Sequence, residues 1–199
     1  MNASAAVDSD PRLRPVRTLL LGLALALFSG LTACEDRPFG YVDWNLSPDT
    51  ARLYSLARPG LNQPSGFDFV DEVPVLIESQ SALNQWDMAL DTRGGQLVAV
   101  PAIGFGLDSR ARIADLGSTP FDEIAEAPGD TVAYSAGAVP LRVGDLYVVR
   151  TRITVGLFGQ SCFSFSKFSP ILLDPVAGVM DFRYDGNPNC NDRRLLPPD

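Results

Sequence analysis

The chain has 199 residues and a formal net charge of −8, and it contains no histidine. The lack of histidine excludes Ser-His-Asp and Cys-His catalysis, His-ligated zinc and bis-histidine haem ligation. The acidic balance disfavours nucleic acid and anionic lipid headgroups as partners. With no recognisable pair of nucleophile and base, we predict a protein that is not an enzyme, has no catalytic or metal site, and binds no nucleic acid.

The N-terminal segment has the pattern of an export signal. Three arginines, the last at Arg17, precede residues 18–33, which are sixteen positions without a charge. This run is short for a membrane span, which needs about 20 apolar residues, and it suits the apolar region of a signal peptide. Leu31 and Ala33 lead into Cys34, so the segment resembles the lipobox of bacterial lipoprotein precursors. The resemblance implies cleavage before Cys34 and a diacylglycerol on its sulfur.

This organisation predicts three parts of the chain. Residues 1–33 are the signal peptide, residues 34–62 are the lipidated cysteine with a tether, and residues 63–199 are a β domain. We expect the lipid to hold the mature chain in the cell envelope, at the outer membrane, on its periplasmic or surface face. The alternatives are an ordinary secretory signal with a coincidental cysteine, or an N-terminal anchor helix. Cleavage would leave 13 basic and 22 acidic residues, a net charge of −9.

The segment before the β domain has aromatic anchors and one helix signal. Phe39, Tyr41 and Trp44 are expected to fix the tether to the domain. The sequence Ser-Pro-Asp at 47–49 is typical of a helix start and predicts a short helix over residues 51–57.

Strand patterns begin after the turn-rich residues 58–66. Residues 67–79 are rich in β-forming side chains, with Pro74 predicting an edge strand or a bulge. Residues 84–92 alternate, which predicts Trp86, Met88 and Leu90 on one face of a strand. The same alternation places Asp87 and Asp91 on the opposite face, which we expect to be solvated.

A hairpin and one further turn follow. Gly94 and Gly95 predict a tight turn into a return strand over residues 96–107. Within residues 118–130, Thr119 and Pro120 suit the start of a single helical turn.

Residues 145–157 form the clearest strand pattern. Tyr147 and Val149 are expected to share a face with Ile153 and Val155. Two arginines, Arg150 and Arg152, lie on the opposite face about 7 Å apart. Such a pair either clamps an anionic ligand or pairs with nearby carboxylates.

Residues 161–174 and 178–190 predict an antiparallel hairpin. If Asp174 faces Gly178, the two residue numbers of every opposed pair add up to 352. Cys162 and Cys190 also add up to 352, so this register places them opposite each other. Opposed residues can bring their Cα atoms to about 5.5 Å, a separation that a disulfide accepts.

We therefore predict a Cys162–Cys190 disulfide, which export to an oxidising compartment would favour. Closing this loop would contribute about 3.5 kcal/mol in the chain-entropy model. A bulge near Phe168 or Pro170 could slip this register by one, and two buried free thiols are the alternative to the disulfide. The overall prediction is a mainly β, single antiparallel domain of hairpins, sheet- or sandwich-like, with little helix.

Several segments together resemble the HmuY-like lipoproteins, a family of mainly β haem-binding proteins tethered to bacterial outer membranes. Trp86-Asp87-Met88-Ala89-Leu90 is similar to a tryptophan-aspartate strand of that family, with Leu90 where an aromatic residue is more usual. The other segments that carry the resemblance are PFDEIAEAP (120–128), YVVRT (147–151), FSKF (165–168) and GVMDFRYD (178–185). Their order agrees over residues 67–186, and it implies an all-β domain with a cleft between finger-like hairpins.

The resemblance raises haem as a ligand without establishing it. Members of the family hold the iron with histidine or methionine, and only Met88 and Met180 remain once the signal is removed. Both fall on apolar strand faces, where a methionine is more often core filler than a ligand. Tyr134, Tyr147 and Tyr184 are further oxygen donors.

Two functions follow from these patterns. The first is a membrane-anchored module that binds haem, another hydrophobic ligand or a protein partner. The second is a structural or assembly lipoprotein that docks on an outer-membrane protein and has no small-molecule site. A large apolar cleft would favour the first, whereas a filled core with a flat apolar patch would favour the second.

Overall fold

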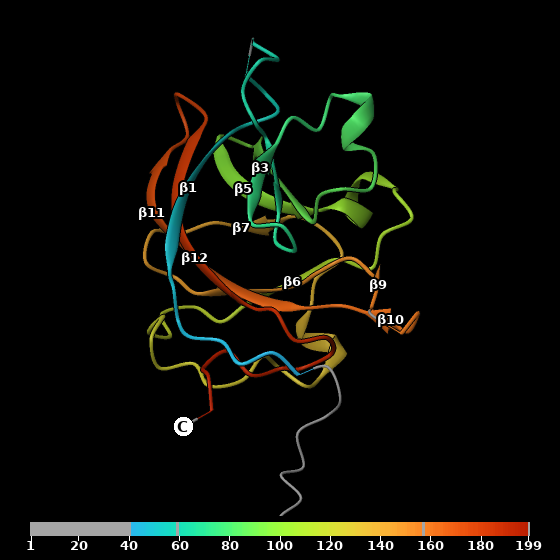
Figure 1. The fold of residues 1–199 in the computed structure, drawn as a ribbon. Helices are drawn as coiled ribbons and strands as arrows, with labels where there is room; N and C mark the ends of the chain where they lie inside the picture. The colour runs from blue at the N-terminus through green and yellow to red at the C-terminus, as the bar shows by residue number, and fades with distance from the viewer. Residues whose placement is uncertain (1–40, 59, 157, 199) are drawn as a thin grey trace, which may run out of the picture. The chain divides into compact units, whose positions relative to one another are not determined.

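The computed structural model describes residues 41–58, 60–156 and 158–198. They belong to a compact unit, residues 40–199, built from two five-stranded antiparallel sheets and a two-stranded ribbon (Figure 1). The prediction of a mainly β fold with little helix is confirmed. The signal peptide, the lipobox, Cys34 and Phe39 lie outside the described residues. No helix in the described part of the chain is long and apolar enough to cross a membrane.

The first sheet joins the N-terminal strand to the C-terminal hairpin, and Figure 1 shows β1, β12 and β11 side by side. Its strands, in spatial order, are β1 (Asp49–Tyr54), β12 (Val179–Asn187), β11 (Phe165–Asp174), β8 (Tyr147–Arg150) and β6 (Arg112–Asp115).

The second sheet is built from the middle of the chain. Its strands, in spatial order, are β3 (Val73–Val75), β2 (Gly66–Asp68), β4 (Met88–Arg93), β5 (Gln96–Pro101) and β7 (Val139–Pro140). The ribbon pairs β9 (Thr154–Val155) with β10 (Ser161–Cys162). The described helical segments are 3-10 turns, namely η2 (Gln80–Ala82), η3 (Ala102–Phe105) and η4 (Thr131–Ala133).

The inner faces of the two sheets pack on each other and form the main core. Alternation along each strand directs every second side chain inward. The ring centroid of Phe67 in the second sheet therefore lies 5.1 Å from that of Phe182 and 4.8 Å from that of Tyr184 in the first sheet. The other buried strand residues of this core are Leu53, Met88, Leu90, Leu97, Ala99, Ile113, Val139, Tyr147, Val149, Phe168 and Met180. The arrangement is a β-sandwich.

Two local predictions in the second sheet are confirmed. Gly94 and Gly95 have φ of 59° and 79°, the left-handed conformation that a two-residue hairpin turn requires, and they join Arg93 to Gln96. Pro74 lies in β3, an edge strand, where its missing N–H costs no ladder hydrogen bond.

The predicted helix over residues 51–57 is wrong. Residues 49–54 form β1, which pairs along β12 with Leu53 opposite Met180. Leu53 is fully buried in the core, so sheet pairing and burial outweigh the local helix-start signal. Part of the segment assigned to the tether is therefore a strand of the domain.

Two further expectations are wrong. The strand over residues 145–157 ends at Arg150, and Ile153 and Val155 are 47% and 81% exposed rather than on the face of Tyr147. Residues 118–130 hold a turn in which the Glu123 N–H donates to the Pro120 carbonyl, but no helix. Thr119 does not cap it, because its hydroxyl donates to the Leu116 carbonyl.

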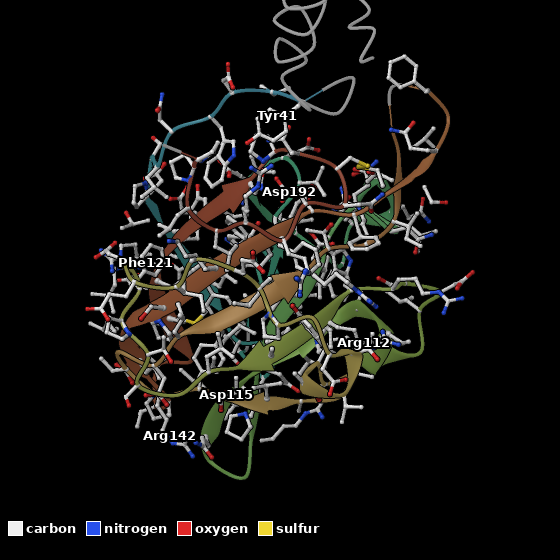
Figure 2. All side chains as sticks on the ribbon, turned by 90° about the horizontal axis from the view of Figure 1, so that it is seen from below. Tyr41, Arg112, Asp115, Phe121, Arg142 and Asp192 are labelled. Atoms are coloured by element: carbon white, nitrogen blue, oxygen red, sulfur yellow. A yellow bond between two sulfur atoms is a disulfide. The ribbon has the colours of Figure 1, made fainter. Side chains whose placement is uncertain are left out.

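Long segments cover the outer face of the first sheet. Figure 2, which views the molecule from below, shows the loop carrying Phe121 across these strands. Phe165 and Val148 of the sheet pack here with Tyr134 and Leu195 in a second apolar cluster. Beneath Phe121 lies the chain's one lysine, Lys167, which is 1% exposed with its Nζ 4.7 Å from the ring centroid.

The C-terminal hairpin has the predicted register over residues 165–170, but not next to its turn. Its turn closes at Asp174 opposite Val179, one residue beyond the expected Gly178. An irregularity between Pro170 and Leu172 then shifts the pairing back, so the numbers of paired residues again add up to 352 as far as the last pair, Phe165 with Asn187.

The predicted disulfide is confirmed. Cys162 and Cys190 are bonded, with their Cα atoms 5.1 Å apart. They lie just past the paired part of the hairpin, Cys162 in β10 and Cys190 in the turn after β12. The bond therefore ties the ribbon to the C-terminal segment.

Candidate anion-binding site

The structure does not bring the predicted ligand residues together. Met88 and Met180 are fully buried core residues on opposite sheets. Tyr147 is also fully buried, and its hydroxyl donates to the Pro140 carbonyl and accepts from the Arg142 N–H, each at 3.0 Å. Side chains thus fill the space between the sheets. Of the five predicted ligand residues, Arg150 and Arg152 border pockets in the described part of the chain.

Arg152 is held in a buried ion cluster with Asp68 and Asp87. Its guanidinium donates to both carboxylate oxygens of Asp68, at 2.6 and 2.8 Å, and to Asp87 at 3.1 Å. Asp87 also accepts from the backbone N–H groups of Arg152 (2.7 Å) and Phe69 (2.9 Å). We call these three side chains the Arg152 cluster. It links a segment after β8 in the first sheet to β2 and the start of β4 in the second.

The Arg152 cluster corrects the prediction for Asp87. This side chain is fully buried instead of solvated, because β4 begins only at Met88 and the alternation does not extend back to it. For the same reason Trp86 packs in a separate apolar cluster with Ala89. Burial raises the pKa of Asp87 to about 6, against the hydrogen bonds from Arg152 and Phe69 that lower it.

Arg150 lies in different surroundings, although it is only two residues away. It is directly opposite Arg112 in the pairing of β6 with β8. Like charges in directly opposed strand positions are destabilising. The pKa of Arg112 is lowered, first by burial and then by the charges of Arg150 and Arg110.

These three arginines, Arg110, Arg112 and Arg150, form what we call the arginine cluster. Within the described residues none of them makes an ion pair with a carboxylate. Two of them donate side-chain hydrogen bonds to backbone carbonyls, Arg112 to Ala111 (3.0 Å) and Arg150 to Arg110 (3.2 Å). The buried Nε of Arg150 has no acceptor.

Aromatic side chains and a further arginine frame one side of this cluster. The Arg150 guanidinium lies 5.4 Å from the ring centroid of Phe163 and 6.0 Å from that of Tyr134. These three residues line a pocket of about 210 Å³ together with Arg193, which pairs with Glu126 at 3.1 Å. Arg110 borders another pocket, of about 400 Å³, that also includes Arg152 and Asp108.

The disulfide helps to build the smaller pocket. Phe163 follows Cys162, and Asn191 follows Cys190, so the bond joins two pocket walls. The same walls are joined by hydrogen bonds in both directions: the Asn191 N–H donates to the Phe163 carbonyl at 2.8 Å, and the Phe163 N–H donates to Asn191 Oδ1 at 3.2 Å.

The arrangement presents guanidinium donors beside aromatic faces. Guanidinium groups match carboxylate and phosphate oxygens in geometry and charge, and partial burial strengthens such hydrogen bonds. The sequence pattern paired Arg150 with Arg152, whereas the structure places Arg112 directly opposite Arg150. Arg112, labelled in Figure 2, takes the place expected for Arg152. The arginines at 110 and 112 alternate as those at 150 and 152 do, and this was the available signal.

No family model matches the sequence, and no curated protein matches it either. The likeness to the HmuY-like lipoproteins therefore stays a prediction from the quoted segments, and the site must be interpreted from its own geometry.

Proposed function

We propose that this chain is a lipid-anchored, exported β-sandwich that binds a small anionic ligand, carrying a carboxylate or phosphate group, at the arginine cluster. Cys34 is the anchor, the cell envelope is the location, and the domain binds without catalysing a reaction. The observation that carries the proposal is the direct opposition of Arg112 and Arg150 with no carboxylate partner in the described residues.

The excess of acidic residues makes the lack of a carboxylate partner for Arg112 and Arg150 more significant. The chain carries 24 acidic residues against 16 basic ones, so partners for three arginines are plentiful. Other arginines of the domain use them: Arg52 pairs with Asp181 at 2.6 Å, and Arg194 with Asp192 at 2.8 Å. An unpaired cluster on an acidic domain concentrates positive potential where an anion would relieve the repulsion.

The pocket volume favours a small ligand. Pockets for drug-sized ligands span roughly 300–1,000 Å³, whereas the pocket beside Arg150 measures about 210 Å³. Its rings, from Tyr134 and Phe163, suit a ligand with a flat apolar part next to its charge. Haem also carries carboxylates, so haemin belongs among the ligands tested.

The test is calorimetric titration of the full chain in mild detergent with benzoate, inorganic phosphate and haemin, and with the neutral analogue benzamide. We expect saturable binding of an anion, no binding of benzamide, and an affinity that falls as salt is added. Arg150→Gln should weaken binding about tenfold or more, the value of one charge-assisted hydrogen bond. Arg93→Gln removes an exposed arginine away from the pocket and is the matched control.

Two results would overturn the proposed ligand class. One is the absence of saturable binding by any of the three anions. The other is equal binding by the wild type and by Arg150→Gln. The anchor is tested separately, by fractionation: Cys34→Ser should move the protein from the membrane pellet to the soluble fraction, and retention in the pellet would remove lipidation at Cys34.

A further inference from the structure

A larger pocket, of about 550 Å³, lies where the segment before β1, the β2–β3 turn and the end of β12 meet. Four carboxylates and two aromatic rings are among the side chains that line it, and no lysine or arginine is among its described lining residues. We call it the acidic cleft; these six residues are Asp49, Asp71, Glu72, Asp185, Trp44 and Phe69.

Glu72 is fixed over the end of β12. Its φ of 57° is in the left-handed region, which an ordinary side chain seldom adopts and which often marks a functional position. The Tyr184 hydroxyl donates to its carbonyl at 3.3 Å. Gly186 leaves room for the carboxylate, since a Cβ there would lie 3.3 Å from Glu72 Oε1 and 2.7 Å from Ser166 Oγ.

Asp185 is a buried carboxylate with an unsatisfied oxygen. The residue is 5% exposed, its Oδ1 accepts from the Gly186 N–H at 3.1 Å, and its Oδ2 has no hydrogen-bond partner. Lys167 is directly opposite in the β11–β12 pairing, yet the two make no ion pair and Lys167 Nζ lies against the ring of Phe121. An unpartnered carboxylate oxygen at this depth costs free energy unless a donor reaches it.

The acids of the acidic cleft repel one another. Partial desolvation of its carboxylate raises the pKa of Glu72, and the charges of Asp185 and Asp49 raise it further. Burial also raises the pKa of Asp185, against the hydrogen bonds from Ser47 and Gly186 and the charges of Lys167 and Arg183, which lower it. The indole Nε1 of Trp44 is likewise buried without an acceptor. Like charges converge here beside two aromatic rings.

We propose that the acidic cleft binds a small organic cation that carries a primary ammonium or guanidinium group. Such a cation supplies the donors that Asp185 and Glu72 lack and can lie against the faces of Trp44 and Phe69. A bare metal ion fits less well, because the described residues contain no group of three acidic or cysteine side chains placed to hold one. This inference is independent of the arginine cluster.

The test uses the full chain in mild detergent, with agmatine as the probe because it carries one guanidinium and one ammonium group. Only two tryptophans are present, and Trp86 is 4% exposed in an apolar cluster, so a change in fluorescence reports Trp44. We expect a saturable fluorescence change that Trp44→Phe abolishes. Calorimetry should show that Glu72→Gln weakens agmatine binding about tenfold or more.

The control is Glu123→Gln, an exposed glutamate outside the cleft, which should bind agmatine like the wild type. Glu72 is itself exposed, so its variant should fold even if Asp185→Asn does not. The proposal is overturned if agmatine gives no saturable change, if Glu72→Gln and Glu123→Gln bind equally well, or if Ca²⁺ binds the cleft and agmatine fails to displace it.

Discussion

Arg150 and Arg152 are two residues apart, and the domain uses them in opposite ways. The guanidinium of Arg152 is matched by Asp68 and Asp87, so every charge of the Arg152 cluster has a partner. That of Arg150 faces Arg112 and two aromatic rings instead. The sequence pattern could not predict these different surroundings, because it treats both arginines as part of one strand, whereas β8 ends at Arg150 and Arg152 lies beyond it. The Arg152 cluster links segments of the two sheets, whereas the arginine cluster lacks a carboxylate partner among the described residues, which is the basis of the proposed anion site.

Removing Arg152 should give the largest effect on stability. Arg152→Ala leaves the fully buried Asp87 without its counter-ion, which typically costs about 3–5 kcal/mol of unfolding free energy. Arg150→Ala should change it by about 1 kcal/mol or less, since no ion pair is lost. Urea denaturation of both variants checks the contrast, and equal losses would contradict the distinction between the two arginines.

Breaking the disulfide should affect both stability and the candidate site. The double variant Cys162→Ser, Cys190→Ser should lose about 2–4 kcal/mol of unfolding free energy. It should also bind anions more weakly than the wild type at a temperature where both are folded, because Phe163 and Asn191 are then joined by hydrogen bonds alone. Unchanged anion binding would show that the disulfide does not shape the pocket.

The pH dependence of stability tests the role of Asp87 in the Arg152 cluster. The folded pKa of Asp87, about 6, lies above its ordinary value of 3.8, so the folded state binds more protons between about pH 4 and 6. The resulting stabilisation is fully present below about pH 4 and is lost as the pH rises through 6; it amounts to about 1–3 kcal/mol. Asp87→Asn should flatten this slope in thermal melts, and stability that rises with pH across this window would contradict it.

Removing Arg112 should have the smallest effect on stability. Arg112→Gln relieves the repulsion with Arg150, so the unfolding free energy should stay unchanged or rise by about 0.2–1 kcal/mol. Anion affinity should nevertheless fall. A variant that is clearly destabilised would show that the arginine cluster is structural, and the distinction from the Arg152 cluster would fail.

The sequence predicted those features that depend on local alternation and turn chemistry. The hairpin turn at Gly94 and Gly95, the edge position of Pro74 and the apolar face that carries Met180 all follow from such rules. The disulfide was also predicted, although an error of one residue at the turn was offset by the irregularity after Pro170. A bulge near Pro170 was considered from the sequence, whereas the displacement of the turn by one residue has no recognisable signal there.

Features that depend on which strands become neighbours were not predictable. Asp87 looked solvated because its partner Arg152 lies 65 positions further along the chain, in the segment that follows β8 of the other sheet. Arg112 was overlooked because nothing in the sequence states that β6 pairs with β8. The helix signal at 47–49 failed for the same reason, as the edge of β12 that captures β1 is about 130 residues distant.

The position of the disulfide has a consequence for when the proposed anion pocket can be completed. Its two cysteines each precede a wall residue of the pocket beside Arg150, so covalent closure of that pocket has to wait for oxidation of the thiols. Reducing cytosol keeps thiols apart, whereas the compartment beyond the inner membrane joins them. If the chain is exported and binds anions as proposed, the newly made precursor would cross the reducing cytosol with this pocket not yet closed covalently, and the bond would form only after export.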